Sequence, residues 1–274
     1  MDTIQSIIIA VVEGLTEFLP VSSTGHMIIT EKILNITQDD FSKVFTISIQ
    51  LGAILAVVVL YWKKFLDFKN WQFYAKLAAA VIPALVLGYL FSDKIDALLE
   101  SSTTVAITML AGGIILLFID NLFKKPEVTK EEDISFLKAI IIGIWQCIAM
   151  IPGVSRSAAS IIGGMQQKLT RNAAAEFSFF LAVPTMLAAT LYSLFLKNWE
   201  TNNVAKKGYQ LIMETSQNTT SFVIGNIVAF VVALLAIKFF IGFLKKHGFN
   251  IWGYYRIVVG IVLLVLIYTG YIKS

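Results

Sequence analysis

The sequence predicts an all-α polytopic membrane protein, an inverted-topology repeat with about six transmembrane helices and two re-entrant helical hairpins. Of its 274 residues, 57% are hydrophobic and 15% are charged, whereas a soluble domain carries about a quarter charged residues. Several apolar stretches approach or exceed the roughly 20 residues that a helix needs to cross a bilayer, and they lack the polar faces of a soluble helical protein. We expect spans at Val44–Trp62, Leu77–Ser92, Thr103–Ile119, Ala173–Leu196, Phe222–Ile237 and Ile257–Ile272.

Two further apolar regions are interrupted in the middle. Residues 4–34 break at Leu19–Gly25, and residues 136–166 break at Ile151–Ser157. The arms on either side of each break are too short to span comfortably. Polar backbone is tolerated at membrane depth only where it is buried in protein or lines a wet cavity. Each region is therefore predicted to be a re-entrant hairpin with a polar tip.

The two breaks resemble each other and indicate a weak internal repeat. Pro20 and Pro152 lie about 132 residues apart, and each precedes serines and a helix-forming stretch. We expect one membrane domain, 1–274, with half one at about 1–121 and half two at about 136–274. Broken helices in corresponding halves indicate a binding site at the repeat interface, near the membrane midplane.

Loop charges predict the orientation. One face receives about twice as many Lys and Arg residues as the other, with Lys238 and Arg256 counted on the richer face, and the positive-inside rule makes that face cytoplasmic. Both termini then lie outside, and the hairpins enter from opposite sides.

Orientation also explains the net charge of +4, so we expect no nucleic-acid partner. No basic region precedes the first apolar run, which argues against a cleaved signal peptide. The single cysteine, Cys147, excludes an internal disulfide.

The first hairpin carries two carboxylates. Glu13 and Glu17 are four residues apart and share one helical face. Inserting a charged residue into the membrane at mid-helix is unfavourable by about 2.5–3.5 kcal/mol. The alternative is that this helix lies at the membrane interface, where both glutamates would be exposed. Paired carboxylates suit a divalent cation, Mg²⁺ or Ca²⁺, that bridges to substrate phosphates. Without a metal, the pair could act in acid–base chemistry.

The tip of the first hairpin has the composition of an anion site. Ser22, Ser23 and Thr24 supply hydroxyls and free N–H groups at a helix N-terminus, and Gly25 permits close approach of a ligand. His26 can exchange protons near neutral pH, although a lone histidine is more often structural. A serine within reach of a histidine is the usual form of an activated oxygen nucleophile.

The second break supplies a cation. Arg156 is flanked by Ser155 and Ser157, with Ser160 one turn later and Gly153 before it. A guanidinium binds phosphate oxygens in a bidentate manner and stays charged, although an arginine can also snorkel to the interface. Two helix N-termini and Arg156 would stabilise the charge of a phosphoryl-transfer transition state. Weaker candidates for supporting roles are Gln50, Gln146 and Glu176, whereas His247 lies in a basic loop.

The motifs at the two breaks identify a family. The segment Glu13–His26 resembles the first signature of the bacterial undecaprenyl pyrophosphate phosphatases of the bacitracin-resistance type, and Pro152–Ser157 resembles the second. The likeness extends over nearly the whole chain, including Gln50–Leu55, Ala174–Phe179 and Tyr255–Ile257. After the second signature, Ala158-Ala159-Ser160 stands where the family usually has Gly-Ala-Thr. Ser160 keeps a hydroxyl there, whereas Ala158 could stiffen or crowd the loop.

The resemblance implies hydrolysis of the C55 lipid undecaprenyl pyrophosphate to its monophosphate, which recycles the lipid carrier of cell-wall synthesis. It further implies an inverted-repeat fold in the bacterial plasma (inner) membrane, contact with membrane lipid, and a homodimer. The implied catalytic residues are Glu13, Glu17, Ser23, His26 and Arg156. The implied substrate-binding residues are Ser22, Thr24, Gly25, Gly153, Ser155, Ser157 and Ser160.

Two questions stay open at this level. Ser23 could attack the terminal phosphorus with His26 as base, or His26 could itself attack. A transporter or flippase for a phosphorylated lipid is the rival function, because inverted repeats with broken helices also build transporters. The signatures of the type-2 phosphatidic acid phosphatases are absent from the chain.

Overall fold

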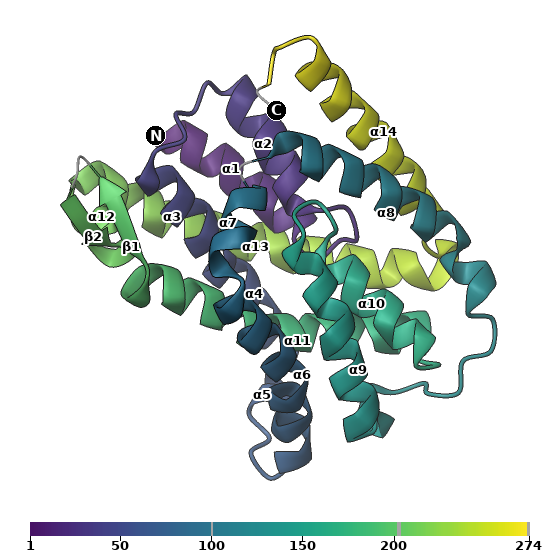
Figure 1. The fold of residues 1–274 in the computed structure, drawn as a ribbon. Coiled ribbons are helices and arrows are strands. Elements are labelled where there is room, and N and C mark those ends of the chain that lie inside the picture. The colour runs from purple at the N-terminus through teal and green to yellow at the C-terminus, as the bar shows by residue number, and fades with distance from the viewer. Residues whose placement is uncertain (100, 202–203, 273–274) are drawn as a thin grey trace.

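The protein is described by a computed structural model that covers residues 1–99, 101–201 and 204–272, and it is almost entirely helical (Figure 1). The helices of the first half are α1 (Thr3–Thr16), α2 (Ser23–Ile33), α3 (Asp40–Ser48), α4 (Gln50–Leu60), α5 (Trp62–Phe65), α6 (Trp71–Leu90), α7 (Ser92–Leu99) and α8 (Ser102–Leu122). Those of the second half are α9 (Phe136–Cys147), α10 (Arg156–Gln166), α11 (Arg171–Leu191), α12 (Gly208–Met213), α13 (Ser216–His247) and α14 (Asn250–Tyr268). Short 3₁₀ turns lie at Glu131–Asp133 and Ile148–Met150, a π turn at Tyr192–Leu196, and strands β1 (Asn198–Thr201) and β2 (Val204–Lys207) pair antiparallel.

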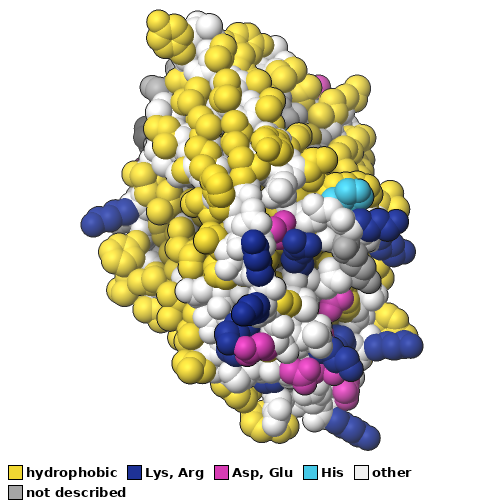
Figure 2. Space-filling model, turned by 90° about the vertical axis from the view of Figure 1, so that its right-hand side faces the viewer, with side chains coloured by type: hydrophobic (Ala, Val, Ile, Leu, Met, Phe, Trp, Pro, Cys, Tyr) yellow, Lys and Arg dark blue, Asp and Glu magenta, His cyan; other side chains and the backbone are white. Residues whose placement is uncertain are grey.

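Within the described residues, six helices are long and apolar enough to cross a membrane, as predicted. They are Asp40–Leu60 (α3 and α4 together), Trp71–Leu90, Ser102–Leu122, Arg171–Leu196, Ser216–Leu244 and Asn250–Tyr268. Large apolar side chains cover the outside of this bundle, and on the face in Figure 2 the charged side chains gather on its lower part. An apolar exterior of this kind suits a lipid environment and not water.

The prediction for the last span was wrong at its start. The helix begins at Asn250, not near Ile257, and Arg256 lies inside it with 0% of its surface exposed. The charge count had placed Arg256 at the cytoplasmic face, because an arginine at the end of an apolar stretch usually marks a membrane boundary. Its actual position is decided by contacts with distant segments, which a charge count does not include.

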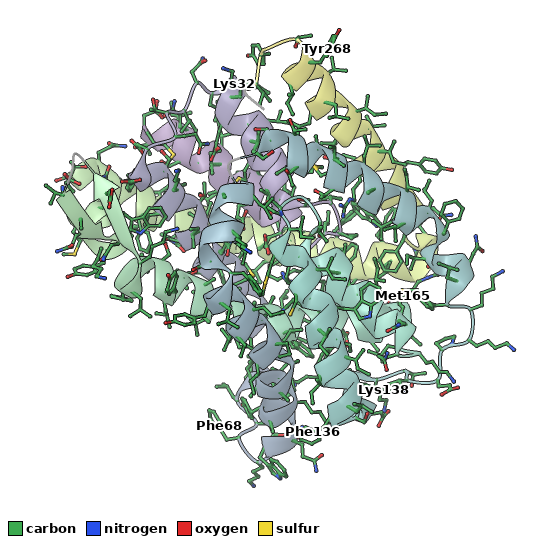
Figure 3. All side chains as sticks on the ribbon, viewed as in Figure 1. Lys32, Phe68, Phe136, Lys138, Met165 and Tyr268 are labelled. Atoms are coloured by element: carbon green, nitrogen blue, oxygen red, sulfur yellow. The ribbon has the colours of Figure 1, made fainter. Side chains whose placement is uncertain are left out.

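The two breaks lie where the sequence places them. The arms α1, α2, α9 and α10 contain 14, 11, 12 and 11 residues, fewer than the roughly 20 needed for a span. Lys32, at the end of the first hairpin, lies near the upper end of Figure 3, with Tyr268. Phe136 and Lys138, at the start of the second hairpin, lie near the lower end. The two hairpins therefore open toward opposite ends of the molecule.

The two halves pack on each other reciprocally. Helix α1 of the first hairpin packs on α13, and α9 of the second hairpin packs on α6. Both contacts depend on a glycine: a Cβ at Gly14 would overlap Val232 of α13, and a Cβ at Gly143 would overlap the backbone of Ala80 in α6. Helix α4 also packs on α11, and α8 on α14 (Figure 1). This reciprocity is what an inverted repeat would produce, and the division at 1–121 and 136–274 stays a prediction.

Candidate active site

Both hairpin tips hold a serine in an unusual backbone conformation. Ser22 has φ 69° and Ser155 has φ 76°, and each is the N-cap of the helix that follows. Positive φ is uncommon outside glycine and is retained where the surrounding structure enforces it, often at functional sites. The second tip contains one more residue between its proline and its N-cap, and it includes Gly153 at φ 85°. The first helical residues after the two tips are therefore Ser23 and Arg156.

The two tips enclose a cavity of about 200 Å³. Both breaks contribute to its lining, as expected for a site at the interface of the two halves. Gln50, which the sequence suggested for a supporting role, also lines the cavity and therefore lies at the site. The full lining is Glu17, Ser22, Ser23, Thr24, Gln50, Ala149, Gly153, Ser155, Arg156 and Met186.

A chain of polar contacts crosses the cavity from one tip to the other. Ser23 donates a hydrogen bond from Oγ to Glu17 Oε2 at 2.7 Å, and Arg156 Nη2 lies 3.2 Å from Glu17 Oε1. The guanidinium also donates to the carbonyl of Ser178 at 3.0 Å and lies over the ring of Phe18. The Arg156 and Glu17 side chains are 13% and 8% exposed, so their ion pair is largely removed from solvent. One carboxylate therefore orients both the predicted nucleophile and the predicted phosphate ligand.

Three buried polar atoms around this contact chain have no hydrogen-bond partner. They are Glu13 Oε1, Ser22 Oγ and Arg156 Nε. Buried polar groups in proteins are almost always paired, so unpaired ones require an explanation such as an absent ligand or ion. A hydroxyl and a guanidinium N–H are donors that an anion would satisfy, and a carboxylate oxygen is an acceptor that a cation would satisfy.

The paired glutamates fit a divalent cation. Glu13 is 1% exposed and lies one helical turn before Glu17, so a proton or a cation would relieve the repulsion between the two buried carboxylates. Each carboxylate oxygen has more than one lone pair, which leaves Glu17 able to accept a ligand beside its present partners. No group of three or more His, Cys, Asp or Glu that could hold a metal occurs among the described residues. An ion here would complete its shell with water or phosphate oxygens, as Mg²⁺ commonly does.

His26 is held by two other groups. Its Nδ1 lies 2.8 Å from the carbonyl of Ser22, and its Nε2 lies 2.8 Å from the hydroxyl of Tyr255. A carbonyl can only accept, so Nδ1 carries the proton and Nε2 of the neutral ring accepts from Tyr255. Within the described structure no hydrogen bond joins Ser23 to His26, and Ser23 turns to Glu17 instead. The roles predicted for Ser23 and His26 stay predictions, but the serine–histidine contact is not formed in this conformation.

Three predicted ligand residues support the tips and do not line the cavity. Ser157 is fully buried and donates to the carbonyl of Phe18 at 2.8 Å, which joins the two hairpins. Ser160 is also fully buried and lies 2.6 Å from the Ser178 hydroxyl. At Gly25, a Cβ would overlap the sulfur of Met109 in α8, so this glycine permits packing of the tip against α8.

Sequence reasoning singled out none of Ser178, Tyr255 and Arg256 for the site. Ser178 could have been noticed as a polar residue within an apolar span, and it contacts both Arg156 and Ser160. Tyr255 and Arg256 lie in the segment Tyr255–Ile257 that resembles the family, but their contacts could not be predicted, because their partners lie more than 100 positions away in the chain. Arg256 reaches both tips, with Nη1 3.3 Å from the Pro20 carbonyl and 2.9 Å from that of Val154.

The other weaker candidates lie outside the cavity. Gln146 donates from Nε2 to Thr185 at 3.1 Å, and its buried Oε1 has no partner. Glu176 hydrogen-bonds Tyr61. His247 is exposed, as predicted, but it is the last residue of α13 and not a loop residue, and its ring stacks on Phe243 one turn earlier.

The chain is similar to known proteins over nearly its whole length. The profile of the family described as bacitracin resistance protein BacA matches residues 6–262. The chain belongs to that family. It is 60% identical to the undecaprenyl-diphosphatase of Flavobacterium psychrophilum over 97% of this chain and 96% of the relative. The undecaprenyl-diphosphatases of Porphyromonas gingivalis and Enterococcus faecalis are 48% and 40% identical, and in each case at least 97% of both chains is covered. The family predicted from the two signatures is thus confirmed.

Proposed function

We propose that this protein is an undecaprenyl-diphosphatase, which hydrolyses undecaprenyl pyrophosphate to undecaprenyl phosphate and inorganic phosphate in the bacterial plasma membrane. The name shared by the relatives supports the reaction, and the six apolar spans support a multi-pass membrane location. The observation that carries the proposal is the cavity between the two tips. There, a serine, a carboxylate and a guanidinium are linked, and buried donors on both tips lack partners.

In the proposed first step, Ser23 Oγ forms a bond to the terminal phosphorus. The bridging P–O bond breaks, and its electron pair leaves with undecaprenyl phosphate. The serine proton passes to Glu17 Oε2, which already accepts the hydrogen bond from this hydroxyl. Arg156 stabilises the charge on the phosphate oxygens, as a fixed guanidinium does in phosphoryl transfer. In the second step, a water oxygen forms a bond to the phosphorus, the P–Oγ bond breaks, and Glu17 returns its proton to Ser23 Oγ as inorganic phosphate leaves.

His26 is the alternative nucleophile or base. Its Nε2 carries the lone pair but accepts from Tyr255, so attack by His26 would first require that this hydrogen bond break. The contacts therefore favour Ser23 as the nucleophile and Glu17 as its base.

The proposal includes Mg²⁺ or Ca²⁺ held by Glu13 and Glu17. When bound, such an ion neutralises charge on the phosphate oxygens. We also propose the homodimer that the family resemblance implies. The molar mass of the detergent-solubilised protein, measured by light scattering, would test it, and a monomer at all concentrations would contradict it.

The test is phosphate release from undecaprenyl pyrophosphate by the purified protein in detergent, where no second compartment exists. We expect release by the wild-type protein and a loss of at least about a hundredfold in Ser23→Ala, because a covalent step through Ser23 would be lost. The matched control is Ser216→Ala, which removes an exposed hydroxyl at the start of α13 and should leave the rate unchanged. Tight substrate binding without release would favour a flippase, for which the reciprocal packing of the halves is also suited.

A further inference from the structure

Arg256 is a fully buried arginine whose contacts are all with backbone carbonyls. Nε donates to Met109 at 3.2 Å, Nη1 to Pro20 at 3.3 Å and Val154 at 2.9 Å, and Nη2 to Thr108 at 3.2 Å and Gly153 at 2.9 Å. A guanidinium has five N–H donors, and here each donor has one carbonyl partner. No carboxylate forms an ion pair with Arg256 among the described residues.

The five carbonyls come from three segments that the sequence separates widely. Pro20 belongs to the first tip, Gly153 and Val154 belong to the second tip, and the remaining two belong to the middle of α8. Backbone carbonyls at a helix break lack their intrahelical donors, and within a membrane they must be satisfied by protein or by water in a cavity. Arg256 supplies these donors to both tips at once.

The space around the guanidinium is tightly closed. A Cβ at Gly112 in α8 would overlap Arg256 Nη2. Thr108, one turn earlier on α8, donates from Oγ1 to the Pro152 carbonyl at 2.5 Å. With all donors occupied and no exposed surface, Arg256 has no free N–H to offer a phosphate. It therefore cannot act as a substrate ligand in this conformation.

We propose that Arg256 is a positioning residue for the reaction, an inference that rests on the proposed function. It fixes the two tips relative to each other, so that Ser23 at the start of α2 and Arg156 at the start of α10 act on the same pyrophosphate. The planar fork is essential to this role, because its five donors point outward around its edge, whereas a lysine has three donors on one nitrogen and cannot reach five carbonyls from three segments. A positive charge without the planar fork would not be sufficient to hold both tips in place.

Two variants test this role through different residues. Arg256→Lys keeps the charge and removes the fork, and Gly112→Ala displaces the guanidinium without changing it. We expect each to reduce kcat/KM for phosphate release by about 10- to 100-fold, because displacements of about 1 Å can reduce rates by 10². The matched control is Gly242→Ala, where an added Cβ meets nothing within 4 Å, and it should stay within about twofold of wild type. All variants are compared as monodisperse protein of measured thermal stability.

A double-mutant cycle separates positioning from general destabilisation. Arg156→Lys is measured in the wild-type, Arg256→Lys and Gly112→Ala backgrounds. If Arg256 acts through the placement of Arg156, the loss caused by Arg156→Lys should be at least about threefold smaller in either variant background, since coupled residues are non-additive. The inference would be overturned if Arg156→Lys reduced kcat/KM by the same factor in all three backgrounds. It would also be overturned if the Arg256→Lys and Gly112→Ala proteins were as active as wild type. A wild-type protein that releases no phosphate would instead contradict the proposed function.

Discussion

Replacing Arg156 with lysine should reduce catalysis strongly while preserving the charge at the second tip. The guanidinium uses one Nη for Ser178 and the other for Glu17, and its buried Nε has no partner. Nε could therefore hold one phosphate oxygen, and Nη2 could hold a second in place of its weak 3.7 Å contact with the Met186 sulfur. Charge-assisted hydrogen bonds contribute roughly 1.5–3 kcal/mol each. Lysine keeps one of the two, so we expect a loss of roughly 1.5–3 kcal/mol, which corresponds to about 10- to 150-fold in kcat/KM at 1.36 kcal/mol per tenfold.

The assay is steady-state phosphate release by the detergent-solubilised protein, with the thermal midpoint measured in parallel. Arg171→Lys is the matched control, because Arg171 pairs with Asp120 outside the cavity and is 41% exposed. Its activity should stay within about twofold of wild type, as expected for an exposed ion pair. The reasoning about Arg156 would be refuted if Arg156→Lys, folded as well as the control, lost no more activity than the control does.

Three further predictions concern packing, pH and metal. Gly52→Ala would place a Cβ against the backbone of Asn226, and the overpacking should destabilise the protein by about 1–3 kcal/mol; an unchanged thermal midpoint would contradict the close packing of α4 on α13. The hydrogen bond and charge of Lys64 hold the pKa of Glu132 below its ordinary value, so this exposed pair stabilises the fold at neutral pH and the effect is lost as the pH falls through the lowered pKa. Lys64 also pairs with Glu131, so the substitution that removes only this pair is Glu132→Gln. In a thermal-midpoint series between pH 3 and 7 (roughly the range of carboxyl titration), Glu132→Gln should lose its deficit toward the acid end, and a deficit independent of pH would count against the pair. A chelator should abolish phosphate release, and added Mg²⁺ or Ca²⁺ should restore it. The Glu13→Gln protein should need at least about tenfold more cation for half-maximal activity. Full activity after chelation would exclude the proposed metal.

Local features of the sequence were enough to predict most of the architecture. Six spans are found from length and hydropathy alone, because a bilayer imposes both on any helix that crosses it. The tips at Pro20 and Pro152 are also local features, since each proline is followed by serines that favour a turn and a helix N-terminus, whereas Pro83 and Pro184 lie within the long helices α6 and α11. The contact between Glu17 and Ser23 is local as well, as the two residues flank one turn, but Ser23 was expected to pair with His26, so this contact was not predicted.

Contacts between the halves could not be predicted in this way. The sequence indicated that Arg156 binds phosphate, but only the folded chain shows that it pairs with Glu17, 139 positions away. Ser157 was predicted to bind substrate, yet the fold directs its hydroxyl to the Phe18 carbonyl. Local sequence does not specify which face of one hairpin meets the other, so it could not distinguish a ligand hydroxyl from a structural one.

The sequence by itself determined that the chain lies in a membrane, that two broken hairpins interrupt it, and which polar residues the breaks carry. Only the tertiary structure decided that Arg256 lies between the two tips and not at the membrane boundary. The physical reason is that hydropathy assigns each charge an unfavourable energy from its own position in the chain. The carbonyls that stabilise Arg256 come from both breaks and from α8, and they surround it only when these segments have packed together.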